Sequence, residues 1–115
     1  MISQVRPADL PAWIADQTAG GRSPAVVLDV REPWEIQTAS VTPEGFELVV
    51  IPMNEIPARL GELDPARPLA CLCHHGARSQ RVASFLAQRG FGQLANIAGG
   101  IEAWSLERDP AVPRY

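Results

Sequence analysis

The stretch Cys73-His74-His75-Gly76-Ala77-Arg78-Ser79 decides how the rest of this 115-residue chain is arranged. It follows an apolar run, Leu69 to Leu72, and leads into a segment from Gln80 to Arg89 with apolar residues at helical spacing. This order predicts a buried strand, a tight loop that opens on a cysteine, and an amphipathic helix. The unpaired N–H groups and partial positive charge at the start of a helix favour a thiolate. We therefore interpret Cys73 as a nucleophile.

The bulk properties of the chain limit what kind of protein it can be. Its length allows one domain with one core, and its composition is that of a globular protein without a membrane span. The formal net charge of −3 argues against a general nucleic-acid binder. Residues 1–7 carry no signal-peptide pattern, so we expect a cytoplasmic, reducing location in which Cys71 and Cys73 stay thiols.

Charge is unevenly distributed along the chain. Between Asp64 and Glu102 there is no acidic residue, although four arginines and both histidines fall there. The local excess of positive charge suits an anionic substrate. We expect Arg81 and Arg89 to lie on a solvated helix face, whereas Arg78 lies inside the loop and is a candidate for substrate binding.

Apolar runs alternate with helical segments along the whole chain. The runs predict strands at residues 2–5, 25–30, 46–51, 69–72 and 94–98, with helices at 7–14, 54–60, 80–89 and 101–104 and a loop at 36–45. This alternation predicts an α/β fold with a mainly parallel central sheet and helices on both faces. We expect residues 1–108 to form the domain and residues 109–115 an irregular C-terminal tail.

Charged residues also appear abruptly where the predicted strand at 25–30 ends. The sequence there is Asp29-Val30-Arg31-Glu32-Pro33-Trp34-Glu35. Open parallel sheets place their sites at the carboxyl ends of their strands, so Asp29 and Arg31 are predicted to support the Cys73 loop. A local ion pair that holds a turn is the alternative, and the two interpretations overlap.

The loop itself has the residue types that an anion-holding ring needs. Backbone N–H groups from His74 through His75, Gly76 and Ala77 to Ser79 can surround an anion at or beyond the sulfur. Gly76 permits a backbone angle that a side chain resists. Arg78 supplies a permanent cation with a planar fork of donors, and Ser79 can cap the helix or donate its hydroxyl. No carboxylate-held general base of the cysteine-protease kind is present in the pattern.

These motifs resemble those of the rhodanese (thiosulfate sulfurtransferase) family. The resemblance runs in order from Ile2 to Trp104 and is carried by Leu28-Asp29-Val30-Arg31, Pro52, Cys73-x-x-Gly76-x-Arg78-Ser79 and Gly99-Gly100-Ile101-Glu102-Ala103-Trp104. The chain departs from the family at residues 38–45, where many members have a Gly-His-Ile-Pro-Gly-Ala stretch. Donor preference is therefore the property that the resemblance leaves open.

The resemblance implies a double-displacement reaction without a cofactor or metal. Cys73 would take a sulfane sulfur from a small-molecule donor such as thiosulfate and pass it to a cyanide or thiol acceptor. A persulfide carrier between protein partners uses the same cysteine and is the main alternative. A phosphatase or arsenate reductase is a weaker one, since those loops place five residues between cysteine and arginine, and only four intervene here. An inactive interaction domain is a third alternative, and the presence of Cys73 argues against it because such domains usually lack the cysteine.

Several residues near the loop have competing interpretations. A zinc site at His74 and His75 is disfavoured, because consecutive histidines are expected to project differently and no distant ligand pair completes the site. Cys71 is either a resolving thiol for Cys73 or, as we favour, a small buried hydrophobe. Trp34 is the tryptophan expected near the site, whereas Trp13 and Trp104 are expected in the core.

Overall fold

A computed structural model describes residues 2–19 and 24–115 of the chain. Its strands are Ile2–Val5 (β1), Val26–Asp29 (β2), Glu47–Val50 (β3), Leu69–Leu72 (β4) and Leu94–Ile97 (β5). Its α-helices are Leu10–Gln17 (α1), Pro33–Thr38 (α2), Ala77–Gln88 (α3) and Gly100–Glu107 (α4). Short 3₁₀ helices span Pro7–Asp9 (η1), Met53–Glu55 (η2) and Leu60–Glu62 (η3). In the described part of the chain, no helix has the length and apolar character needed to cross a membrane.

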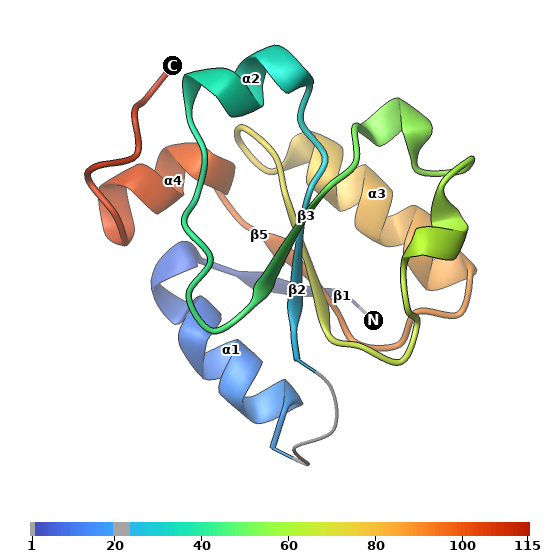
Figure 1. The fold of residues 1–115 in the computed structure, drawn as a ribbon. Coiled ribbons are helices and arrows are strands. Elements are labelled where there is room, and N and C mark those ends of the chain that lie inside the picture. The colour runs from blue at the N-terminus through green and yellow to red at the C-terminus, as the bar shows by residue number, and fades with distance from the viewer. Residues whose placement is uncertain (1, 20–23) are drawn as a thin grey trace.

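The strands form one sheet in the order β1-β5-β4-β2-β3, and every pair is parallel (Figure 1). The predicted α/β class and parallel sheet are therefore confirmed. β2 and β4 are neighbours in register, with Asp29 opposite Leu72. From β2 the chain moves outward to β3 and then returns past β2 to β4, so a switch of direction lies between these strands. Ligands bind at such points, beyond the carboxyl ends of the strands.

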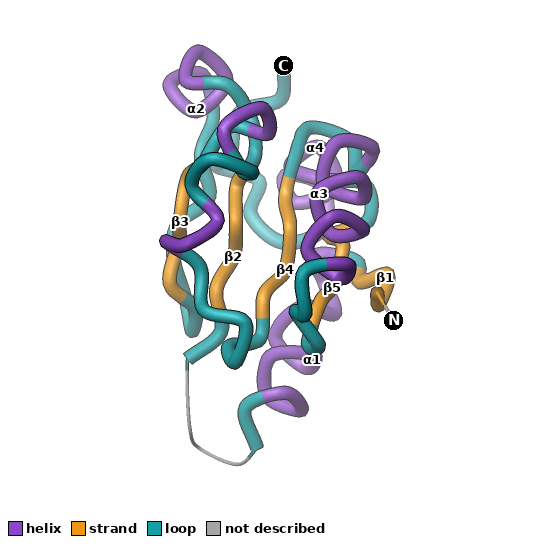
Figure 2. Tube along the Cα trace, turned by 90° about the vertical axis from the view of Figure 1, so that its right-hand side faces the viewer, coloured by secondary structure: helices purple, strands orange, loops and turns teal. Residues whose placement is uncertain are grey.

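Both faces of the sheet are covered (Figure 2). Side chains of β4 alternate between the two apolar layers, with Ala70 and Leu72 in one and Leu69 and Cys71 in the other. The first layer packs under α1 and α4, and the second packs under α3 and the segment that contains η2. This period of two explains why every β4 residue is buried, as the unbroken apolar run predicts.

Two predicted segments differ from the structure. The sequence predicts a loop at residues 36–45, but Pro33–Thr38 forms α2. This helix starts at a proline and has a capping box of Glu32 and Glu35 at its N-terminus. The helix expected at 54–60 is wrong, because η2 and η3 are separate 3₁₀ turns there. Apolar spacing could not distinguish these cases, since each segment has fewer than two turns of helix.

The tail, residues 109–115, is irregular as predicted and folds back along α4. Its Val112 is buried in the same apolar layer as Trp104. The Ser105 hydroxyl donates to the Val112 carbonyl over 2.7 Å, and Arg114 pairs with Glu102. The tail therefore contributes to the core.

The start of α4 lies directly against the Cys73 loop. The N–H groups of Ile101 and Glu102 donate to the carbonyl oxygens of Cys73 and His74 over 2.9 and 3.2 Å. Gly100 makes this approach possible, with a φ of +61° and no Cβ. A Cβ at Gly100 would lie 2.3 Å from the His74 carbonyl oxygen and 2.5 Å from that of Cys73.

Gly100→Ala is therefore expected to destabilise the fold by at least about 2 kcal/mol more than Gly45→Ala, because backbone atoms cannot move aside cheaply. Gly45 has a φ of +80°, and a Cβ added there would have nothing within 4 Å, so it isolates the cost of the left-handed backbone. Urea unfolding followed by tryptophan fluorescence measures both variants. Equal decreases in the free energy of unfolding for the two variants would show that the Cys73 loop can move to make room for a Cβ at residue 100.

Candidate active site

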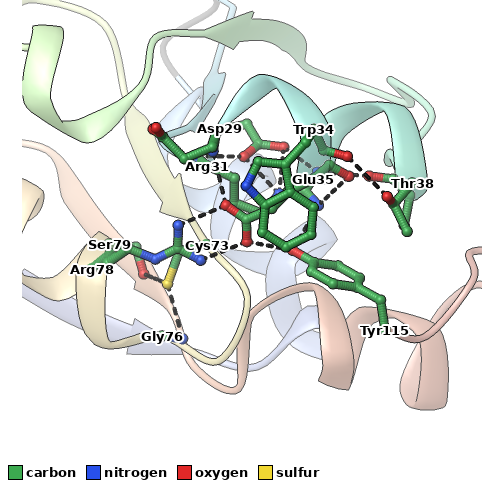
Figure 3. Close-up of polar contacts among 12 residues, drawn as sticks. Asp29, Arg31, Trp34, Glu35, Thr38, Cys73, Gly76, Arg78, Ser79 and Tyr115 are labelled. Carbon is green, nitrogen blue, oxygen red and sulfur yellow. Dashed lines mark hydrogen bonds and ion pairs between the residues drawn. The ribbon is translucent and has the colours of Figure 1, made fainter.

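Cys73 lies at the carboxyl end of β4, where the chain turns into α3. The residue is 1% exposed, and its sulfur accepts the Gly76 N–H over 3.1 Å (Figure 3). Gly76 has a φ of +108°, which confirms the predicted need for a residue without a side chain. The turn therefore closes a backbone donor onto the predicted nucleophile.

Ser79 lies within 3.3 Å of the Cys73 sulfur and is fully buried. Its hydroxyl also contacts the Asn96 Oδ1 atom from β5. The Asn96 amide nitrogen donates to the Gly76 carbonyl over 3.2 Å, so the oxygen of this amide must face Ser79. Ser79 then donates to Asn96 and accepts from the Cys73 thiol.

Arg78 stands in the first turn of α3, and both of its terminal nitrogens bind Glu35 of α2. The two nitrogen–oxygen distances are 2.8 Å (Figure 3). The carboxylate is buried, whereas the Arg78 side chain is 30% exposed. This bidentate pair joins α2 to the helix that follows the nucleophile.

The Glu35 carboxylate has a full set of donors. Besides Arg78 it accepts the Glu32 N–H and the Tyr115 hydroxyl, each over 2.8 Å. These bonds, with Arg78 as the largest contributor, lower the pKa of Glu35 from 4.5 to about 2. Glu35 is therefore ionised throughout the neutral range, and the charge of Arg78 is compensated.

Asp29 and Arg31 form a second buried pair beside the first. Arg31 donates to both Asp29 carboxylate oxygens, with Nη2 at 2.7 Å and Nε at 2.9 Å. It also donates to the main-chain oxygens of Glu35 and Ala39, over 3.3 and 2.8 Å. Arg31 thus binds α2 at Glu35, in its first turn, and at Ala39, the residue after its end, and so helps to position Glu35. In this arrangement Asp29 and Arg31 reach the Cys73 loop through α2 and not by direct contact.

Tyr115, in the tail, contacts both ion pairs. Its hydroxyl donates to Glu35 and accepts from Arg31, whose Nη1 lies 3.1 Å away. Its ring stacks on His74, with centroids 3.9 Å apart and planes at 9°. Burial raises the pKa of the Tyr115 hydroxyl, which keeps its proton available for Glu35.

The histidines of the loop do not project in different directions, contrary to the sequence-based expectation. The His74 and His75 rings stack with centroids 3.9 Å apart, and Tyr115 also stacks on the His74 ring. Burial and the neighbouring His75 lower the pKa of His74, so its ring is neutral at pH 7. Ligand atoms of His74, His75 and Glu102 lie within 4.8 Å of one another, but Glu102 already pairs with Arg114.

The remaining predicted residues lie as follows. Cys71 is fully buried in an apolar layer, as we favoured, and this burial raises the pKa of its thiol. Arg81 is exposed on α3, and Arg89 is exposed just after the end of this helix. Trp34 is 62% exposed and its ring meets Tyr115 edge-on at 5.9 Å, close to the site as expected.

Sequence reasoning missed Glu35, Asn96 and Tyr115. The capping pattern Glu32-Pro33-Trp34-Glu35 could have revealed α2, and hence the place of Glu35 one turn after Arg31. Asn96 was visible as a polar residue inside an apolar strand. Tyr115 gave no signal, since its partners are 80 and 84 residues away in the chain.

Comparisons with known proteins identify the family of this chain. Residues 10–107 match the model of the Rhodanese-like domain family. A sulfurtransferase from Allochromatium vinosum is 31% identical over 112 residues, which cover 97% of this chain and 96% of that protein. The chloroplastic Rhodanese-like/PpiC domain-containing protein 12 of Arabidopsis thaliana is 41% identical over 95 residues, which cover 79% of this chain and 30% of that protein. The crystal structure of a rhodanese-related protein from Thermoplasma volcanium has a TM-score of 0.73 and 28% identity, covering 98% of this chain and 99% of that one.

A parallel α/β domain with a cysteine loop at the switch point defines the class, and the chain belongs to the rhodanese-like domain family. The family inferred from the sequence motifs is therefore confirmed. The chain spans almost the whole of the A. vinosum sulfurtransferase, but less than a third of the Arabidopsis protein. Its relatives support a sulfurtransferase role.

Glu35→Gln is expected to lower the free energy of unfolding by about 2 kcal/mol at pH 7, because it leaves Arg78 without its counter-charge. The pKa of Glu35 is lower in the folded protein, so this contribution is complete above pH 4.5 and is lost as the pH falls toward about 2. Urea unfolding of the parent and of Glu35→Gln should show that the difference between their free energies of unfolding becomes smaller as the pH falls through this range.

Glu44→Gln, at an exposed carboxylate in the loop before β3, is the control and should give no such pH-dependent difference. A difference in free energy of unfolding between the parent and Glu35→Gln that stayed constant down to pH 2 would contradict the role assigned to the ion pair.

Proposed function

We propose that this protein is a sulfurtransferase that carries a sulfane sulfur as a persulfide on Cys73. The observation that carries the proposal is the position of the Cys73 sulfur, which accepts the Gly76 N–H at 3.1 Å beside the start of α3. That arrangement stabilises negative charge on sulfur, both in the thiolate and in the persulfide anion. The sulfurtransferases among the relatives support the same chemistry.

The proposed reaction has two displacements. The Cys73 thiolate attacks the outer sulfur of a donor such as thiosulfate, the donor S–S bond breaks, and sulfite leaves with the bonding electrons. A thiophile such as cyanide then attacks the outer sulfur of the persulfide and leaves as thiocyanate, which regenerates the thiolate. Neither step needs a cofactor, because the loop N–H groups and the helix terminus balance the charge at sulfur. We also propose a reducing, cytoplasmic setting, in which both cysteines remain thiols.

A persulfide carrier acting between protein partners is the second candidate. The pairing of Arg78 with Glu35 favours it, because an anionic donor must compete with a buried carboxylate for that arginine. A persulfide presented by a partner would depend on the loop N–H groups more than on Arg78. The prediction that Arg78 binds the charge of a small donor remains open to test.

Cys73→Ser is expected to abolish the gain of one sulfur atom when the reduced protein is mixed with thiosulfate, because a serine hydroxyl is not ionised at pH 7. Intact-mass spectrometry before and after thiosulfate, and again after cyanide, measures the gain and its reversal with release of thiocyanate. A Cys73→Ser protein that still gained sulfur would overturn the assignment. Gain from a small-molecule persulfide but not from thiosulfate would favour the carrier, and turnover of p-nitrophenyl phosphate or arsenate would favour the weaker alternatives.

Cys71→Ser is the matched variant, two residues earlier in β4. We expect it to retain persulfide formation and most of the turnover, since Cys71 is buried in an apolar layer and burial raises the pKa of its thiol. Its free energy of unfolding should fall by about 1 to 2 kcal/mol, the cost of a hydroxyl in an apolar layer. Loss of turnover with the fold intact would instead make Cys71 a redox partner of Cys73.

A further inference from the structure

The loop from Cys73 to Ser79 is held at both ends by one side chain from the tail. At its start, the Tyr115 ring lies 3.9 Å from the ring of His74, the residue after the nucleophile, with the planes almost parallel. At its end, the Tyr115 hydroxyl donates over 2.8 Å to Glu35, whose carboxylate accepts two hydrogen bonds from Arg78. Figure 3 shows this hydroxyl beside the Glu35 carboxylate, on the side that faces away from Cys73.

The same hydroxyl joins the two buried ion pairs. It accepts from Arg31 over 3.1 Å while it donates to Glu35, so the chain of contacts runs Asp29–Arg31–Tyr115–Glu35–Arg78. A neutral hydroxyl is suited to this place because it can accept from the cation and donate to the anion at once. Phenylalanine keeps the ring on His74 but breaks this bridge.

The position of the tail is set by contacts of residues other than Tyr115. The Asp109 N–H donates to the Trp104 carbonyl over 2.9 Å, Val112 is buried, and Ser105 binds the Val112 carbonyl. The tail is therefore packed against α4 by residues that precede Tyr115, and these contacts place Tyr115 beside the loop.

We propose that Tyr115 is a positioning residue that clamps both ends of the Cys73 loop and so keeps the Gly76 N–H on the sulfur. This proposal rests on the proposed function for its catalytic consequence, but its structural part can be tested without any sulfur chemistry. Tyr115 touches neither the sulfur nor its hydrogen-bond donor, and it acts through His74 and through Glu35.

Hydrogen–deuterium exchange tests the structural part directly. In Tyr115→Leu, which loses both the stacking and the bridge, the peptide that contains residues 73–79 should exchange about tenfold faster, while peptides from β2 and β5 stay protected as in the parent. Tyr115→Phe should give an intermediate increase, because it loses the hydroxyl alone. Gly45→Ala, a destabilising change elsewhere in the chain, serves as the stability control and should not open the loop selectively. Parental exchange in Tyr115→Leu would overturn the proposal.

Steady-state sulfur transfer from thiosulfate to cyanide tests the catalytic part. We expect kcat to fall about tenfold in Tyr115→Leu and about threefold in Tyr115→Phe, with KM for thiosulfate changed less than twofold, because positioning affects the transition state and not donor binding. An increase in KM at constant kcat would make Tyr115 a binding residue and overturn the proposal. If the parent protein takes no sulfur from any donor, the proposed function fails, while the exchange result still decides whether the clamp exists.

Discussion

The ion pair between Arg78 and Glu35 is the interaction on which the rest of the site depends. It is the direct bond between the helix that carries the nucleophile loop and the short helix that follows β2, with both nitrogen–oxygen distances at 2.8 Å. A bidentate pair fixes orientation as well as distance. Because Arg78 precedes Ser79, which contacts the Cys73 sulfur, the pair sets where the serine hydroxyl stands relative to the nucleophile. Arg31 has the supporting role, since it binds the main-chain oxygens of Glu35 within α2 and of Ala39 just after it.

On the side of α4, the loop is held by backbone hydrogen bonds. α4 places two N–H groups on the carbonyls of Cys73 and His74, and Gly100 allows that contact. With these carbonyls bound by α4, the Gly76 N–H remains directed at the sulfur. The two supports have different sensitivities. Acid weakens the Glu35 side as that carboxylate is protonated, whereas the backbone hydrogen bonds to α4 depend on the absence of a side chain at Gly100.

The sequence predicted the parts of the fold that local patterns encode. The unbroken apolar runs at β2 and β4 mark buried parallel strands, and the cysteine between β4 and an amphipathic helix marks the site. α2 was missed because six residues provide no apolar periodicity, although its capping box was legible. The partners of Arg78 and Arg31 could not be predicted for another reason. Glu35 lies 43 residues before Arg78, and Tyr115 lies 84 residues after Arg31, so these contacts exist only once the sheet has formed.

The compensated charge of Arg78 changes how anion recognition at this site should be understood. From the sequence, Arg78 is a free cation in a loop without acidic neighbours, which suggests direct attraction of an anionic donor. In the folded protein a buried carboxylate, with its pKa lowered to about 2, occupies both ends of its fork. A doubly charged donor must then either displace Glu35, at the cost of a buried uncompensated charge, or bind to backbone N–H groups alone. Donors that carry less charge avoid this competition. Whether a small anionic donor can use Arg78 therefore depends on the strength of the bidentate Arg78–Glu35 pair.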